Sequence, residues 1–170
     1  YLASATFADA MVGRLLAAFD ASPMRDNTII VLWSDHGYHL GHKQHWEKFA
    51  LWEQTTRVPL IISGPNIPQG ARCQTSVSLV DLYPTLAELC QLRPPTKLDG
   101  ESLVPFLKDP KATAERVALI THGRNNHAVR SQHWRYIHYA DGAEELYDHR
   151  QDSQERHNLA NHPEHADIIA

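Results

Sequence analysis

One apolar, β-branched run constrains this chain more than any other feature. Residues 28–33 (TIIVLW) have the composition of a buried strand. The run ends at once in Ser34, Asp35, His36 and Gly37. Open α/β sheets bind ligands beyond the carboxyl ends of their strands, so a carboxylate and an imidazole at this point are well placed for a metal or a polar substrate.

The segments on either side of this run predict an α/β arrangement. Apolar residues recur at helical spacing from Leu2 to Phe19, and Pro23 follows them. A second buried strand is predicted over residues 58–62. The connection between the two strands is long, irregular in pattern and rich in His, Gly and Trp. Long connections of this kind are commonly functional.

The pattern changes along the second half of the chain. A helix is predicted over residues 78–90 and a short one over 101–108, with a proline-containing link between them. Beyond Pro110 there are short strand-like runs and a hairpin signal at Asp141-Gly142, which together predict a small antiparallel sheet. The predicted strands of this sheet are residues 117–120, 127–130, 134–139 and 145–147.

Composition excludes some partners. A formal net charge of −4 gives no electrostatic reason to expect nucleic acid. No run approaches the roughly 20 consecutive apolar residues of a spanning helix, so we expect no membrane span. The two cysteines, Cys73 and Cys90, leave open one disulfide or two buried thiols.

Several short motifs resemble the sulfatases of the alkaline-phosphatase-like superfamily, and among them most closely the iduronate-2-sulfatase-like group. Each motif alone is weak, but their order along nearly the whole chain makes the resemblance specific. They are residues 34–37 (SDHG), 40–41 (LG), 46–48 (WEK), 56–61 (TRVPLI), 80–86 (VDLYPTL), 145–148 (ELYD) and 158–160 (NLA).

The resemblance implies the C-terminal part of an alkaline-phosphatase-like α/β sheet domain plus a small antiparallel β subdomain. On this basis residues 1–95 would belong to the α/β domain and residues 96–111 would form a linker with a short helix. Residues 112–170 would form the antiparallel subdomain and tail. A helix at the start with no strand before it fits a portion of an enzyme better than a whole one.

The resemblance also assigns the first site residues. Asp35 and His36 would bind a divalent metal, usually calcium in such sulfatases, although ligand type alone leaves zinc or manganese open. His36 and Lys48 would be the catalytic residues, with the Lys48 ammonium bound to the sulfate and beside the leaving oxygen. Taken without the resemblance, Asp35 could cap a helix, His36 could be a bystander and Lys48 could be a surface lysine.

Further residues are candidates for substrate binding. Tyr38 and His39 share the loop with Lys48, and the alternative for each is a solvated loop side chain. His127 and Arg130 lie in a second polar cluster that could reach an anionic sugar, and Arg130 could equally pair with a carboxylate on a neighbouring strand. In the iduronate-2-sulfatase pattern a tryptophan is common at the position of Tyr38, and this departure leaves the substrate open.

The sulfatase nucleophile is a formylglycine made within C/S-x-P-x-R, and neither cysteine lies in such a motif. The resemblance therefore implies a parent sulfuric ester hydrolase acting on sulfated carbohydrate, whose N-terminal half supplies the formylglycine. The chain alone should not catalyse sulfate ester hydrolysis. By resemblance to the family, the protein would be periplasmic, secreted or lysosomal. The rivals are a phosphatase or phosphonate monoester hydrolase, or a non-catalytic module that binds sulfated glycans.

Overall fold

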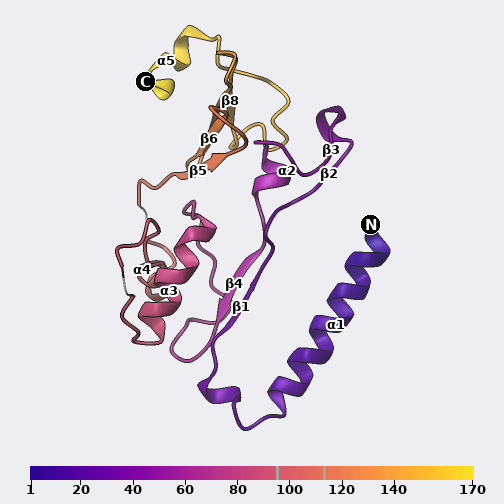
Figure 1. Cartoon of the computed structure of the whole chain (residues 1–170), viewed down its shortest axis with the longest axis vertical. Coiled ribbons are helices and arrows are strands. Elements are labelled where there is room, and N and C mark those ends of the chain that lie inside the picture. Colours follow the sequence, from indigo (N-terminus) through magenta and orange to yellow (C-terminus); the bar gives the residue numbers. More distant parts are fainter. Residues whose placement is uncertain (95, 113) are drawn as a thin grey trace. The chain divides into compact units, whose positions relative to one another are not determined.

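The computed structural model describes residues 1–94, 96–112 and 114–170 (Figure 1). The chain divides into two compact units, Tyr1–Leu32 with Leu60–Gln69, and Trp33–Pro59 with Gly70–Ala170. The predicted mixed α/β class with a small antiparallel sheet is confirmed. The predicted boundary at residue 95 lies outside the described residues, and the predicted three-part division stays a prediction.

The first unit begins with α1, Leu2–Asp20, which confirms the predicted N-terminal helix. None of its residues is buried within the described chain, and large apolar side chains such as Leu2, Phe7 and Leu15 are exposed. By length and composition α1 could also cross a membrane. The expected absence of a membrane span therefore stays a prediction.

A short helical turn, η1 (Arg25–Asn27), leads to the two predicted strands of this unit. They are β1 (Ile30–Trp33) and β4 (Leu60–Ser63), which pair in a two-stranded sheet. The expectation that both strands are buried is wrong for this chain, because every residue of β1 and β4 is half-buried or exposed. A two-stranded sheet has little of its surface covered by other elements of this unit, so the apolar run remains partly exposed to solvent.

The connection between these strands opens the second unit and is more regular than its sequence suggests. β2 (His39–Leu40) and β3 (Trp46–Glu47) form an antiparallel hairpin around the turn η2 (His42–Gln44). Gly41 begins that turn with a φ of 94°, a left-handed conformation that favours glycine. One helical turn, α2 (Glu53–Thr56), follows.

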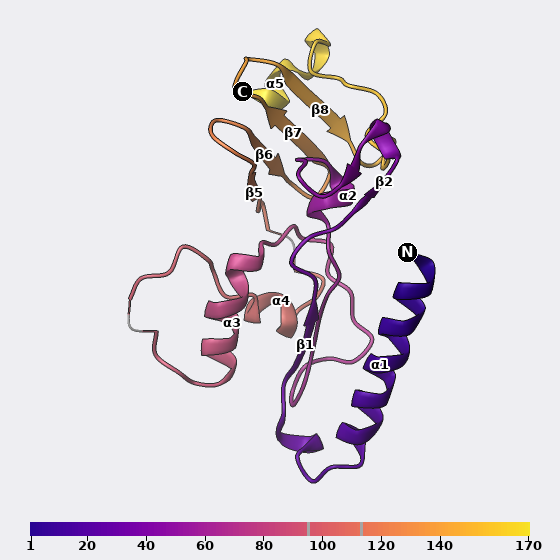
Figure 2. The ribbon, with the colours of Figure 1, turned by 45° about the vertical axis from the view of Figure 1, so that its right-hand side comes forward.

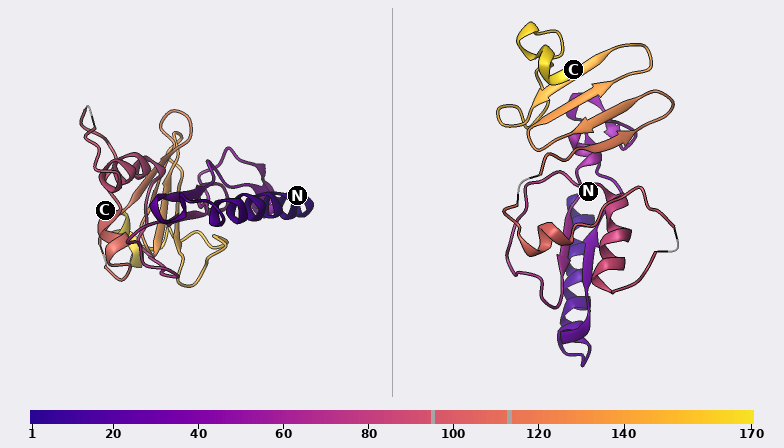
Figure 3. Two further views of the ribbon diagram at one scale, coloured as in Figure 1. Left: turned by 90° about the horizontal axis from the view of Figure 1, so that it is seen from below. Right: turned by 90° about the vertical axis from the view of Figure 1, so that its left-hand side faces the viewer.

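The C-terminal sheet confirms the predicted antiparallel subdomain. Its order is β5-β6-β7-β8, and every pair is antiparallel (Figure 3). Gly142, with a φ of 87°, lies in the predicted hairpin. The strands are β5 (Ala118–Thr121), β6 (His127–Arg130), β7 (Trp134–His138) and β8 (Glu144–Asp148).

One face of this sheet is covered by the segment that leads into α2 (Figure 2). Leu51 packs with Ala128, Ile137 and Tyr147 in a buried cluster. Alternation along β7 places Ile137 and, unexpectedly, the charged Arg135 on the buried side. The loop that follows β1 is therefore held on the antiparallel sheet.

The middle of the second unit contains the predicted helices in shorter form. A capping box between Ser78 and Asp81 starts the helical region, and Asp81 also accepts from Glu101 N–H and pairs with Arg116. Cys73 and Cys90 are both free and exposed, so the expectation of a disulfide or buried thiols is wrong. The remaining elements are η3 (Leu79–Asp81), α3 (Leu82–Leu89), α4 (Val104–Lys108), η4 (Pro163–His165) and α5 (Ala166–Ile169).

Candidate functional site

Asp35 and His36 present two ligand atoms side by side just after β1. The Asp35 side chain is 83% exposed, and its Oδ2 lies 3.7 Å from His36 Nε2. His36 Nδ1 lies 2.7 Å from the Gly37 carbonyl oxygen, so this nitrogen must donate. In the neutral imidazole Nε2 then keeps its lone pair, which is how a backbone carbonyl commonly orients a metal-binding histidine. The carboxylate and this nitrogen fit a divalent cation, which would need further ligands from outside the pair.

A short chain of hydrogen bonds ties Lys48 to the same region. Gly37 N–H donates to Thr55 O at 2.7 Å, and Thr55 Oγ1 donates to Lys48 O at 3.2 Å. The two ends of the loop are thereby joined through α2. The Lys48 ammonium forms no ion pair with any carboxylate in the described part of the chain. A cation without an internal partner is suited to an external anion.

Gly37 is required by this close approach. A Cβ added at Gly37 would lie 1.9 Å from the Gln54 carbonyl oxygen, which is far inside van der Waals contact. Any side chain would therefore push α2 away from the strand end. The glycine in the SDHG motif has a steric role in bringing the loop ends together.

The other predicted substrate-binding residues have different surroundings. Tyr38 is exposed, whereas His39 is fully buried and its ring packs on those of His45 and Trp52. Burial disfavours the charged imidazole and lowers the pKa of His39. His127 is exposed on β6 and its Nδ1 lies 2.9 Å from Thr121 Oγ1. Contact of these three residues with substrate stays a prediction.

Arg130 is engaged inside the chain. Its Nε donates to Glu53 Oε2 at 3.1 Å. Glu53 lies on α2, so the alternative of pairing with Glu145 or Asp148 on a neighbouring strand is wrong. The predicted contact of Arg130 with substrate stays a prediction.

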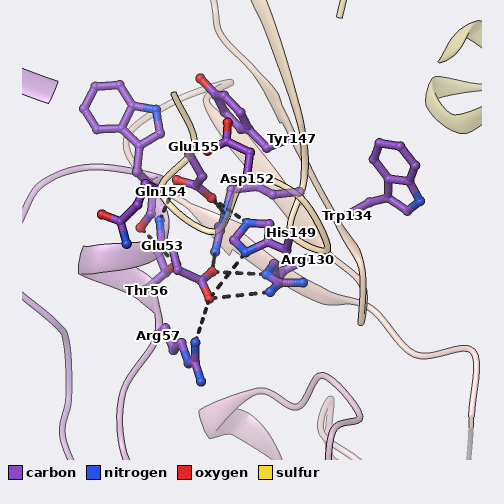
Figure 4. Close-up of polar contacts among 12 residues, drawn as sticks. Glu53, Thr56, Arg57, Arg130, Trp134, Tyr147, His149, Asp152, Gln154 and Glu155 are labelled. Atoms are coloured by element: carbon purple, nitrogen blue, oxygen red, sulfur yellow. Dashed lines mark hydrogen bonds and ion pairs between the residues drawn. The ribbon is translucent and has the colours of Figure 1, made fainter. Parts of the chain in front are cut away.

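Glu53 and Arg130 belong to a buried cluster of charges (Figure 4). Arg135, 1% exposed, pairs with Glu53, places Nε 2.6 Å from Glu155 Oε1, and donates to Leu51 O at 2.8 Å. Glu155 also accepts from Glu53 N–H at 2.9 Å. His149 Nε2 lies 2.9 Å from Glu155 Oε1. The cluster joins α2, β6, β7 and the segment after β8.

The electrostatics of this buried cluster argue for a structural role. Burial alone would raise the pKa of Glu53, but hydrogen bonds and charge from Arg130 and Arg135 outweigh it and lower that pKa to about 2. The pKa of Glu155 is likewise lowered, with His149 and Arg135 outweighing its burial. Glu53, His149 and Glu155 lie close enough together to hold a metal ion. Two guanidiniums already balance the two carboxylates, so a dication there would meet strong repulsion.

No sequence pattern identifies Glu53, Arg135 and Glu155 as a group. They are separated by up to 102 residues, and each is of a type normally found at the surface. The one available hint was the position of Arg135 between Trp134 and Tyr136 in a strand, which places it on the opposite face from both.

The family model described as Sulfatase matches residues 1–92. A "Sulfatase" of Formosa agariphila is 45% identical over 95% of this chain and 32% of the relative. Human "Arylsulfatase K" is 32% identical over 94% of this chain and 33% of its own. "Choline-sulfatase" of Rhizobium meliloti is 36% identical, with 96% and 33% covered. The chain spans about a third of the length of these relatives.

Solved structures show the same partial match. A protein in complex with its substrate D-glucosamine-2-N,6-O-disulfate is 29% identical with a TM-score of 0.82, covering 99% of this chain and 37% of that one. A phosphonate monoester hydrolase from Silicibacter pomeroyi is 25% identical with a TM-score of 0.80, covering 95% and 36%. The matched family model, the motifs and the fold agree, and the chain belongs to the sulfatase family.

Proposed function

We propose that this chain supplies metal-binding and sulfate-binding residues to a sulfuric ester hydrolase that acts on sulfated carbohydrate. One observation carries the proposal. Asp35 and His36 present adjacent ligand atoms, and the Thr55 hydrogen bonds join them to the backbone of Lys48. A divalent metal, calcium by resemblance, would supply positive charge for the sulfate oxygens, and the Lys48 ammonium would add to it.

The mechanism follows from what each side chain can do. Asp35 and His36 Nε2 would hold the cation, and the Gly37 carbonyl keeps the imidazole in the required tautomer. Lys48 binds the anionic sulfate and stabilises negative charge that grows on the leaving oxygen. The nucleophile for the attack on sulfur would come from a formylglycine in the N-terminal half of the same polypeptide. The candidates for contact with the substrate remain Tyr38, His39, His127 and Arg130.

The N-terminal half is the partner that this proposal needs, and α1 offers a surface for it. The relatives are about three times as long as the chain. Large apolar side chains of α1 are exposed within the described residues. Burying them against the remainder of the α/β domain would remove that apolar area from water.

The test is hydrolysis by the complete polypeptide. We expect turnover of p-nitrophenyl sulfate that exceeds turnover of a phenylphosphonate monoester, loss of activity with chelator, and its return with calcium. Asp35→Asn should raise the calcium concentration needed for half activity. Hydrolysis of the phosphonate ester alone would transfer the assignment to a phosphonate monoester hydrolase, a class represented among the structural neighbours.

A second test separates an enzyme from a glycan-binding module. The sequence upstream of residue 1 should contain C/S-x-P-x-R. Its absence from the complete polypeptide, together with binding of sulfated glycan without turnover, would favour the module.

A further inference from the structure

A small pocket lies beside Lys48, wholly within the second unit. It has a volume of about 260 Å³, just below the usual range for small-molecule sites. One wall comes from the loop between β2 and α2, and the other from the β5–β6 turn and the end of β7. The lining residues are His45, Phe49, Ala50, Leu51, Trp52, His122, Asn126 and Tyr139.

The aromatic lining offers carbon faces to a ligand, because its polar ends are already bonded. Trp52 Nε1 donates to Glu145 Oε2 at 2.7 Å. Tyr139 OH donates to Glu145 Oε1 at 3.1 Å. Leu51 adds an aliphatic surface. Such a wall suits the apolar C–H face of a sugar ring or a comparably flat group.

The mouth of the pocket carries an imidazole that is free to bond a ligand. His122 is exposed, and its ring lies 5.8 Å from that of Phe49, centroid to centroid. Within the described residues its ring nitrogens make no hydrogen bond. Phe49 is itself 63% exposed. An aromatic face with a polar group at its edge is a suitable arrangement for a hydroxylated ring.

The charges around the pocket decide between ligand classes. The Lys48 Nζ lies 5.5 Å from the centre of the Phe49 ring, and the Lys43 Nζ lies 5.0 Å from that of Trp52. Both aromatic faces already have an ammonium group nearby. A quaternary ammonium ligand binds through cation–π contacts with such aromatic faces, and here it would be repelled by the positive charges of both lysines. A neutral or anionic ring meets no such penalty.

We propose that this pocket is the subsite for the sugar ring that bears the sulfate ester, with Phe49 and His122 contacting the ring, and that it disfavours sulfates of cationic alcohols. This inference rests on the proposed function, since it needs the ester to lie at Lys48. It goes further in assigning recognition of the alcohol to residues outside the family motifs.

The experiment uses the complete polypeptide and three kinds of ester. p-Nitrophenyl sulfate reports on sulfatase activity itself. A set of monosulfated D-glucoses with D-glucosamine-2-N,6-O-disulfate provides sugar rings, and choline sulfate provides a cationic alcohol. We expect kcat/KM for the best sugar sulfate to exceed that for choline sulfate by at least about tenfold. His122→Ala and Phe49→Ala should each raise KM for that sugar sulfate about tenfold, with kcat changed about twofold or less.

His157→Ala is the matched control, since His157 is an exposed histidine in the segment after β8 and does not line the pocket. It should leave both constants unchanged. One result would overturn the subsite while leaving the proposed function intact. In that result the enzyme hydrolyses p-nitrophenyl sulfate, and its kcat/KM for choline sulfate equals or exceeds that for every sugar sulfate. The same applies if neither pocket variant changes KM for the sugar. Failure to hydrolyse any sulfate ester would instead reject the proposed function, and the subsite with it.

Discussion

Two groups of charged side chains in this chain have opposite surroundings. Asp35 and Lys48 belong to the first, with the Asp35 side chain largely open to solvent and the Lys48 ammonium without an ion pair among the described residues. Glu53, only five residues beyond Lys48, belongs to the second group and is buried. Arg135 forms ion pairs with both Glu53 and Glu155, and Glu155 also accepts from the Glu53 N–H.

This difference in burial distinguishes side chains that can bind a ligand from side chains that stabilise the fold. A buried charge must be paired because its desolvation is costly, so the second group is satisfied internally and has little left to offer a ligand. The first group keeps its capacity for an external metal or anion. The second nevertheless serves the first, because Leu51 and Glu53 fix the start of α2, and Thr55 of α2 holds Gly37 and Lys48.

Breaking the buried group should have the largest effect. Arg135→Ala would leave Glu53 and Glu155 short of a partner, and we expect the free energy of unfolding to fall by about 3–5 kcal/mol. Urea unfolding followed by circular dichroism measures it. The control is Arg150→Ala, which removes an exposed guanidinium paired with Asp148 and should have a much smaller effect. Equal losses for both variants would contradict the distinction between the two groups.

Lys48→Ala tests the opposite behaviour in the exposed group. In the complete polypeptide we expect kcat for p-nitrophenyl sulfate to fall about 10²–10³-fold, since a preorganised charge at the leaving oxygen is lost. The free energy of unfolding should change by less than about 0.5 kcal/mol. Lys108→Ala, at an exposed lysine of α4, is the control and should alter neither quantity. A large loss of stability in Lys48→Ala with normal turnover would reverse its assignment.

Acid should weaken the buried group selectively. The pKa of Glu53 is held at about 2, below its ordinary value of 4.5, so the carboxylate stabilises the fold fully above that ordinary value. This contribution, on the order of 3 kcal/mol, is lost as the pH falls from about 4.5 towards about 2. Urea unfolding at a series of pH values should show that decline, and Glu53→Gln should flatten it. An unchanged slope in the variant would show that other carboxylates are responsible.

The contact between Gly37 and α2 should show the smallest effect. Gly37→Ala places a Cβ against the Gln54 carbonyl, and we expect a loss of about 1–3 kcal/mol in unfolding free energy. Gly13→Ala is the matched control, because nothing lies within 4 Å of its Cβ in α1. Alanine there should stabilise by up to about 1 kcal/mol. If both variants behave alike, the loop ends are not held together as described.

Much of the fold was predictable from local pattern. Helical spacing identified α1, the apolar run identified β1, and Asp141-Gly142 identified the hairpin between β7 and β8. The β2–β3 hairpin was missed, because two-residue strands carry no periodicity. The expected burial of β1 and β4 was wrong, because strand composition does not reveal which neighbouring strands are present.

The candidate site divides in the same way. The motif around Asp35, His36 and Lys48 was readable from the sequence, and the structure adds the hydrogen bonds that join the loop ends. The proposed carbohydrate subsite could not be predicted from the sequence. His122 and Phe49 lie 73 residues apart and only their ring contact across the pocket makes them a pair.

The sequence by itself determined the family, the strand that ends in a carboxylate and an imidazole, and the small antiparallel sheet. These depend on residues near one another in the chain, whose spacing and chemistry are visible without coordinates. Only the tertiary structure decided that Arg135 is buried, that Glu53 is its partner, and that the β5–β6 turn forms a wall beside Lys48. Pairing of charges and closure of a pocket depend on distances between remote segments, and those distances are set by packing.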